Sequence, residues 1–101
     1  KVWPILANRI PQFDSIKLIN SWAGHYAFNT LDQNAIVGPH TYIENFLFVN
    51  GFSGHGFQQS PAMGRGLSEI ITYGEYRNLD LSAFGYARIE NNEPFIEKAV
   101  I

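Results

Sequence analysis

A short apolar run followed by a glycine-rich turn constrains the fold of this chain more than any other feature. The run is Phe46–Val49, and the turn Gly51–Gly56 holds three glycines. A continuous apolar run of this length is typical of a strand covered on both faces, as in the parallel sheets of α/β proteins. Ser60 then predicts a helix cap, with Pro61 at the first helical position and Gly74 as the terminator.

Two further elements are predicted in the first quarter of the chain. Pro4 suits the first turn of a helix, and Pro11 ends it because the residue before a proline avoids the helical region, so Pro4–Ile10 is predicted to be helical. Apolar residues alternate with other residues over Ile16–Trp22, which predicts a strand. The start at Lys1 leads directly into apolar residues, so we expect further sequence upstream.

The middle and the end of the chain follow from similar patterns. Ala35–Val37 is a short apolar segment stopped by Gly38 and Pro39, which predicts a buried strand. Residues 88–101 are polar up to Pro94 and finish with Ala99–Ile101. This composition predicts a surface tail with an anchored tip.

Composition and charge exclude several classes of protein. The 101 residues fit one domain or part of one. Seven Lys and Arg against nine Asp and Glu give a net charge of -2, so a nucleic-acid partner is not expected. No apolar run approaches the roughly 20 residues that a membrane span needs. The chain has no cysteine, which excludes disulfides and thiolate metal sites.

The glycine-rich turn is the strongest candidate for a binding site. Glycine serves where a backbone adopts positive φ or approaches a ligand closely. The predicted helix beyond the turn adds unpaired N–H groups and partial positive charge, which favour an anion or an electron-rich oxygen. The alternative is a tight strand-to-helix connection that binds nothing.

Two familiar motifs do not match this turn. A dinucleotide fingerprint requires a third glycine where this chain has Gln59. A nucleophile elbow requires glycine two residues after its serine, but His55 stands there after Ser53. The near match leaves a serine hydrolase using Ser53 as a minor alternative. A triad histidine normally comes from a distant loop and not from a position as close as that of His55.

The histidines and the aromatic residues give weaker signals. His25, His40 and His55 stand at intervals of fifteen beside predicted turns and lack helical metal-ligand spacing, so no metal site is predicted. Tyr26, with the aromatic residues near it, could line a planar ligand or contribute to a core.

Two stretches of the chain resemble the carboxyl-terminal part of the D-amino-acid oxidase, glycine oxidase and sarcosine oxidase family of FAD-dependent oxidoreductases. One comprises the turn GFSGHG with Gln58–Pro61 and Gly64–Gly66, and the other comprises Trp22–Gly24, Asn29–Asn34 and Ile36–His40. The resemblance covers most of the chain. It is greatest in a subgroup with mitochondrial and bacterial members.

The resemblance implies a mixed α/β fold in a carboxyl-terminal segment, residues 1–101, of a two-part flavoprotein. Residues 46–74 would be the last strand, turn and helix of the Rossmann-like FAD-binding half, and residues 88–101 its tail. The earlier strands would belong to or lie beside the substrate-side sheet. The dinucleotide fingerprint would lie upstream, in the FAD-binding part of the same polypeptide.

The resemblance also implies a set of site residues. The turn and the following helix would pass beside the flavin ring, where amides and a helix start stabilise the negative charge of the reduced ring at N1 and the C2 carbonyl. The candidate cofactor-binding residues are Gly51, Ser53, Gly54, His55, Gly56, Phe57 and Gln58. Candidate substrate-side or flavin-side residues are Gly24, His25 and Tyr26, and Asp32 is a turn-stabilising side chain.

The expected activity is oxidation of a C–N bond in a small amine or amino acid by hydride transfer to FAD. Some sarcosine-oxidising members carry lysine where this chain has Gln58, so the substrate does not carry over. Relatives that attach flavin covalently use cysteine near His25 and Tyr26, which leaves non-covalent binding or a histidyl linkage. The alternative function is a non-catalytic binding or assembly factor. The expected compartment is cytoplasmic, or mitochondrial as the alternative.

Overall fold

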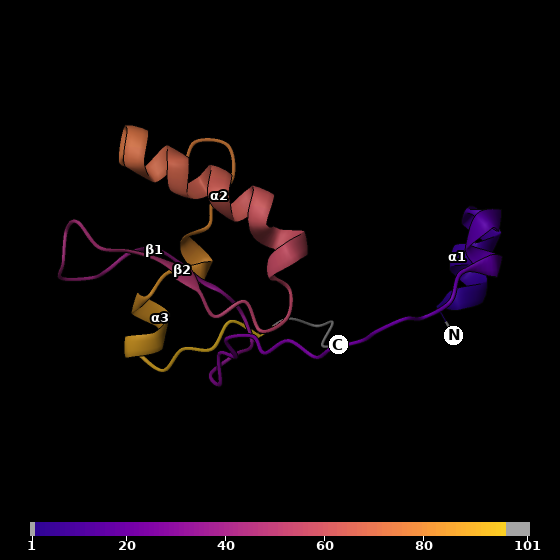
Figure 1. Ribbon diagram of the computed structural model, residues 1–101. Helices are drawn as coiled ribbons and strands as arrows, with labels where there is room; N and C mark the ends of the chain where they lie inside the picture. Colours follow the sequence, from indigo (N-terminus) through magenta and orange to yellow (C-terminus); the bar gives the residue numbers. More distant parts are fainter. Residues whose placement is uncertain (1, 97–101) are drawn as a thin grey trace.

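The computed structural model describes residues 2–96, and these contain a two-stranded antiparallel sheet (Figure 1). Strand β1 (Ile36–Pro39) pairs with β2 (Leu47–Asn50), with Ile36 opposite Asn50 and Pro39 opposite Leu47. The prediction that Phe46–Val49 is a parallel strand covered on both faces is therefore wrong. The short connection 40–46 forms a hairpin, which requires antiparallel pairing, and Val49 remains half exposed.

Helix α2 (Gly56–Tyr73) follows the turn and begins before the predicted cap at Ser60. Pro61 lies inside the helix and has no N–H for the carbonyl of Phe57, four residues earlier. The Ser60 hydroxyl donates a hydrogen bond of 3.2 Å to that carbonyl, so the helix passes through the proline. Gly74 ends the helix in the left-handed region, with φ of 76°, which confirms the predicted terminator.

The core lies between β1, α2 and the segment after α2 (Figure 1). Its buried apolar residues are Ala35 and Val37 from β1 or just before it, Met63 from α2, and Leu81 ahead of the 3₁₀ helix η2 (Ser82–Phe84). Gly66 allows α2 to approach Leu81 closely, because a Cβ on it would overlap with Leu81 Cδ1 and stand 3.2 Å from Leu81 Cγ.

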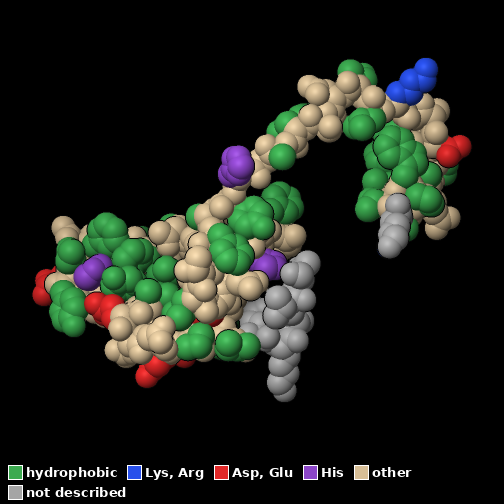
Figure 2. All heavy atoms as spheres, turned by 90° about the horizontal axis from the view of Figure 1, so that it is seen from below, with side chains coloured by type: hydrophobic (Ala, Val, Ile, Leu, Met, Phe, Trp, Pro, Cys, Tyr) green, Lys and Arg blue, Asp and Glu red, His purple; other side chains and the backbone are tan. Residues whose placement is uncertain are grey.

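The N-terminal part extends away from this core (Figure 1). Helix α1 (Trp3–Arg9) confirms the predicted helix, and the 3₁₀ helix η1 (Pro11–Ser15) follows it. The predicted strand over Ile16–Trp22 is wrong: within residues 2–96 it has no ladder partner, and Ile19 is 96% exposed. Figure 2 shows hydrophobic side chains over this arm, and the molecule measures 55 × 28 × 26 Å.

The C-terminal part corrects another prediction. The composition predicts Arg88 in a surface tail, but it lies in helix α3 (Ala87–Glu90) and is buried. Its partner is a carboxylate far away in the sequence, which a local reading does not reveal. Residues 91–96 are exposed, and the predicted anchored tip Ala99–Ile101 lies outside the described residues. The division into segments 46–74 and 88–101 stays a prediction.

In residues 2–96, none of the helices combines the length and the apolar character that crossing a bilayer requires.

Candidate functional site

The turn between β2 and α2 has a backbone that few residues other than glycine adopt. Gly51 and Gly54 have φ values of 69° and 95°. Ser53 also has positive φ, 50°, and it is buried. An isolated bridge joins Phe52 to Phe28, so the turn is held against the loop that precedes β1.

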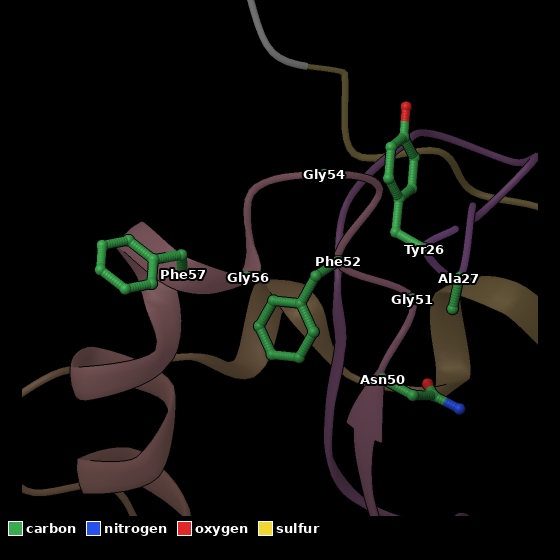
Figure 3. Close-up of a pocket in the computed structure, with 8 residues that line it drawn as sticks. All are labelled: Tyr26, Ala27, Asn50, Gly51, Phe52, Gly54, Gly56 and Phe57. Carbon is green, nitrogen blue, oxygen red and sulfur yellow. The ribbon is translucent and has the colours of Figure 1, made fainter. Parts of the chain in front are cut away.

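An open hollow of about 400 Å³ lies beside the turn (Figure 3). Its walls are mainly aromatic rings and bare backbone. Phe57 lies at the start of α2, Phe52 lies on the turn, and Tyr26 lies on the loop opposite (Figure 3). Among residues 2–96, the lining comprises Tyr26, Ala27, Asn50, Gly51, Phe52, Gly54, Gly56 and Phe57.

Two of the glycines keep the hollow free of side chains. A Cβ on Gly54 would lie 3.4 Å from the ring of Tyr26, and the φ of Gly54 disfavours any other residue. A Cβ on Gly56 would lie 3.2 Å from Phe52 Cβ and 3.3 Å from its Cγ. Substitution of Gly56 would therefore push the Phe52 ring, whereas substitution of Gly54 would strain the backbone.

The N-terminus of α2 opens at this hollow without a neutralising group. The cap residue His55 makes no side-chain capping bond, and the first turn holds no acidic residue. The first hydrogen bond of the helix runs from Gln59 N–H to the His55 carbonyl, at 3.1 Å. The N–H groups of the residues before Gln59 have no carbonyl four residues back within the helix, and the first turn of α2 supplies no acidic side chain to compensate its positive end.

The predicted site residues fall into two groups. Tyr26, Gly51, Gly54, Gly56 and Phe57 line the hollow. The lining also includes three residues that sequence reasoning missed, although each lies next to a predicted one: Ala27, Asn50 and Phe52.

The other predicted site residues are not in the lining. Ser53 is buried behind the turn, and His55 caps the helix. Gln58 is exposed on α2, and Gly24 and His25 lie on the exposed arm before Tyr26. Their functional roles stay predictions.

Ser53 ties the turn to the opposite loop. Its N–H donates to the Ala27 carbonyl at 3.0 Å, and its hydroxyl donates to the Gly51 carbonyl at 3.1 Å. The same hydroxyl accepts a hydrogen bond of 2.9 Å from the backbone N–H of Asn29. These bonds engage the hydroxyl with backbone groups, so the geometry supplies a structural role for Ser53 and nothing that activates a nucleophile.

His40 has a structural role at the other end of the hairpin. Its Nδ1 accepts hydrogen bonds from the N–H groups of Tyr42, at 3.0 Å, and Ile43, at 3.3 Å. Its ring stacks on Phe48 and Tyr86 at centroid distances of 5.7 and 5.0 Å.

In the described part of the chain, no three His, Asp or Glu side chains gather as metal ligands would.

A buried ion pair lies behind the turn. Arg88 Nε donates to Asp32 Oδ2 at 2.7 Å, and the Asp32 side chain has no exposed surface. Burial alone would raise the pKa of Asp32, but the bond from Arg88, those from the N–H groups of Phe95 and Asn34, and the charge of Arg88 together lower it below its usual value. The predicted turn-stabilising role of Asp32 thus extends to a long-range contact.

A second buried carboxylate belongs to α2. Glu69 accepts hydrogen bonds from the Arg77 N–H at 2.8 Å and from the Asn78 N–H and side-chain amide at 3.1 and 2.6 Å. These bonds, with a weaker one from Arg65, lower the pKa of Glu69 to about 2. Glu69 therefore anchors the loop after α2 and lies apart from the residues that line the hollow.

Comparison with known proteins gives a family. Residues 1–70 match the model of a family described as FAD dependent oxidoreductase. This match covers more than half of the chain. The chain belongs to the FAD-dependent oxidoreductase family.

Individual relatives agree with this family. The chain is 48% identical to FAD-dependent oxidoreductase domain-containing protein 1 of Xenopus laevis over all 101 residues, which are 20% of that protein. The Bos taurus protein of the same name is 45% identical over the same length, which is 21% of it. Monomeric sarcosine oxidase of Bacillus sp. (strain B-0618) is 37% identical over 59 residues, 58% of this chain and 15% of that enzyme.

The chain thus spans about a fifth of the length of the first two relatives. No solved structure matches it. The family membership confirms the resemblance found in the sequence, at the level of an FAD-dependent oxidoreductase.

The residues at the hollow fit part of a flavin. A planar ring requires apolar walls and close backbone approach, and Phe52, Phe57 and the side-chain-free Gly54 provide both. The uncapped start of α2 suits the carbonyl and nitrogen edge of such a ring, where electrons accumulate. The donor set available here is therefore consistent with the cofactor in the family's description.

Proposed function

We propose that this chain is the carboxyl-terminal part of a flavoprotein that oxidises the C–N bond of a small amine or amino acid. The observation that carries the proposal is the uncapped start of α2, which opens at a hollow with aromatic and glycine walls. Family membership supports the choice of FAD as the ligand. The sarcosine oxidase match supports an amine as the substrate.

Bound FAD would supply the chemistry by accepting a hydride from the carbon next to the substrate nitrogen. The residues of this chain would orient the ring and stabilise its charge. Phe52 would exclude water from part of its surface, and the backbone at Gly54 and Gly56 would allow close contact. The N–H groups at the start of α2 would stabilise negative charge at N1 and the C2 oxygen, which favours reduction.

The test uses the complete protein that contains this chain. It should purify with bound FAD or take FAD up, which the visible absorbance of the flavin reports. Mixing it without oxygen with secondary amines and amino acids in a stopped-flow instrument should bleach that absorbance. The corresponding hydroxy acids, which offer C–O in place of C–N, should not.

Two results would contradict the proposal. A complete protein that is colourless and takes up no FAD would exclude flavin binding. Bleaching by hydroxy acids but by no amine would retain the flavin and exclude oxidation of C–N bonds.

A further inference from the structure

A continuous series of hydrogen bonds links the turn at the hollow to helix α3. It starts at Ser53, whose hydroxyl contacts the Gly51 carbonyl at 3.1 Å and the Asn29 N–H at 2.9 Å. Ser53 is the residue of this turn other than glycine that has positive φ, 50°, so contacts outside the turn must hold this disfavoured backbone conformation.

Asn29 carries the series onward. Its side-chain amide donates to Asp32 Oδ1 at 2.9 Å and to the Asn34 carbonyl at 2.7 Å. Its Oδ1 accepts from the Leu31 N–H at 3.1 Å. The position of the Asn29 backbone, which holds Ser53, therefore depends on the position of the Asp32 carboxylate.

Arg88 holds that carboxylate from 56 residues further along the chain. Its Nε and Nη2 contact the two oxygens of Asp32 at 2.7 and 3.2 Å. Nη1 also donates to the carbonyls of Phe84 and Gly85, and Nη2 to those of Asn34 and Ala35, at distances from 2.7 to 3.1 Å. A planar guanidinium suits this pattern, which an ammonium group cannot reproduce.

We infer that the Asp32–Arg88 pair positions the Gly51–Gly56 turn and thereby sets how tightly the protein binds FAD and how readily the bound flavin is reduced. This inference rests on the function proposed above. Neither residue lines the hollow, so both would act through Asn29 and Ser53. They are positioning residues and not catalytic ones.

The test compares two buried carboxylate networks of the same chain in the complete protein. Asp32→Asn and Arg88→Met interrupt the network behind the turn, and Glu69→Gln interrupts the one that anchors the loop after α2. Two properties are measured for each variant: the dissociation constant for FAD, from the fluorescence of released flavin, and the reduction potential of the bound flavin. Thermal unfolding shows how much each variant loses in stability.

The Asp32→Asn and Arg88→Met variants should bind FAD about tenfold more weakly, and the reduction potential of their bound flavin should shift. A tenfold change in affinity is typical of coupling through packed networks. Glu69→Gln should lower the melting temperature but leave both flavin properties as in the wild type. Arg88→Lys keeps the charge and loses the bidentate contacts, so it should lie between the wild type and Arg88→Met. It also serves as the test if Arg88→Met fails to fold.

Unchanged FAD affinity and potential in Asp32→Asn and Arg88→Lys would overturn the inference while leaving the flavin function intact. The inference would also be overturned if Glu69→Gln altered FAD affinity and flavin potential as strongly as Asp32→Asn. Loss of stability alone would then explain the effect. A wild-type protein that takes up no FAD would overturn both the proposed function and this inference.

Discussion

Single glycines decide the shape of the hollow. Gly56 is the clearest case, because a Cβ there would lie 3.2 Å from Phe52 Cβ, closer than most real contacts of this kind. Gly64 lies on the same helix, and a Cβ on it would have no neighbour within 4 Å in the described part of the chain. The two positions form a matched pair for substitution.

Gly56→Val should weaken FAD binding in the complete protein by about tenfold, since overpacking costs roughly 1–3 kcal/mol and 1.4 kcal/mol corresponds to a factor of ten. The added methyl groups would push Phe52 into the hollow. Titration of the apoprotein with FAD measures the effect. Gly64→Val is the control, and equal FAD affinity in wild type and Gly56→Val would contradict the assignment of the hollow.

At the scale of elements, α2 packs on the segment after it through a glycine. Gly66→Ala should destabilise the protein by about 1–3 kcal/mol, because the new Cβ would overlap with Leu81 Cδ1 and meet Tyr76 Cε1 at 3.3 Å. Gly64→Ala should stabilise it by up to about 1 kcal/mol, the helix propensity gained over glycine. Urea unfolding measures both, and a Gly66→Ala protein as stable as Gly64→Ala would exclude this packing.

Several helix ends and the two paired strands were predictable from local chemistry in this chain. Pro4 and Pro11 bounded α1 correctly to within a residue, and Gly74 marked the end of α2. The start of α2 was not predictable, because Ser60 hydrogen-bonds the carbonyl that Pro61 leaves free and the helix continues through it. Local signals indicated a cap there and could not show this substitute bond.

The candidate site was predictable in part, for a related reason. Glycines report the backbone directly, so Gly51, Gly54 and Gly56 pointed to the hollow. The buried role of Arg88 was not visible, since it depends on Asp32 at a distance that only the folded chain closes. The predicted strand Ile16–Trp22 has no ladder partner within residues 2–96, and a strand exists only as part of a pair.

At the scale of the whole molecule, two buried carboxylates make stability depend on pH. The folded pKa of Glu69 is about 2, against 4.5 for an unperturbed glutamate, and that of Asp32 is also lowered. A lowered folded pKa means that the ionised group stabilises the fold fully above its unfolded pKa. This contribution to stability is lost as the pH falls through the folded pKa of the group.

The melting temperature should therefore fall between about pH 5 and about pH 2, where protons bind the unfolded chain more strongly than the folded one. Glu69→Gln should reduce this fall, because its amide does not titrate, and it should lower the melting temperature at neutral pH. Melting curves recorded by circular dichroism across this range measure both. Equal pH dependence in wild type and Glu69→Gln would show that Glu69 is not the titrating group.

The wide separation of Asp32 and Arg88 has a consequence for biosynthesis. A ribosome makes the chain from its N-terminus, so the turn at Ser53 is synthesised before Arg88. Until α3 emerges, the nascent turn lacks its anchor and its three positive-φ residues can sample other conformations. Loading of a cofactor at this turn would then be a late event, which occurs only after translation has passed α3.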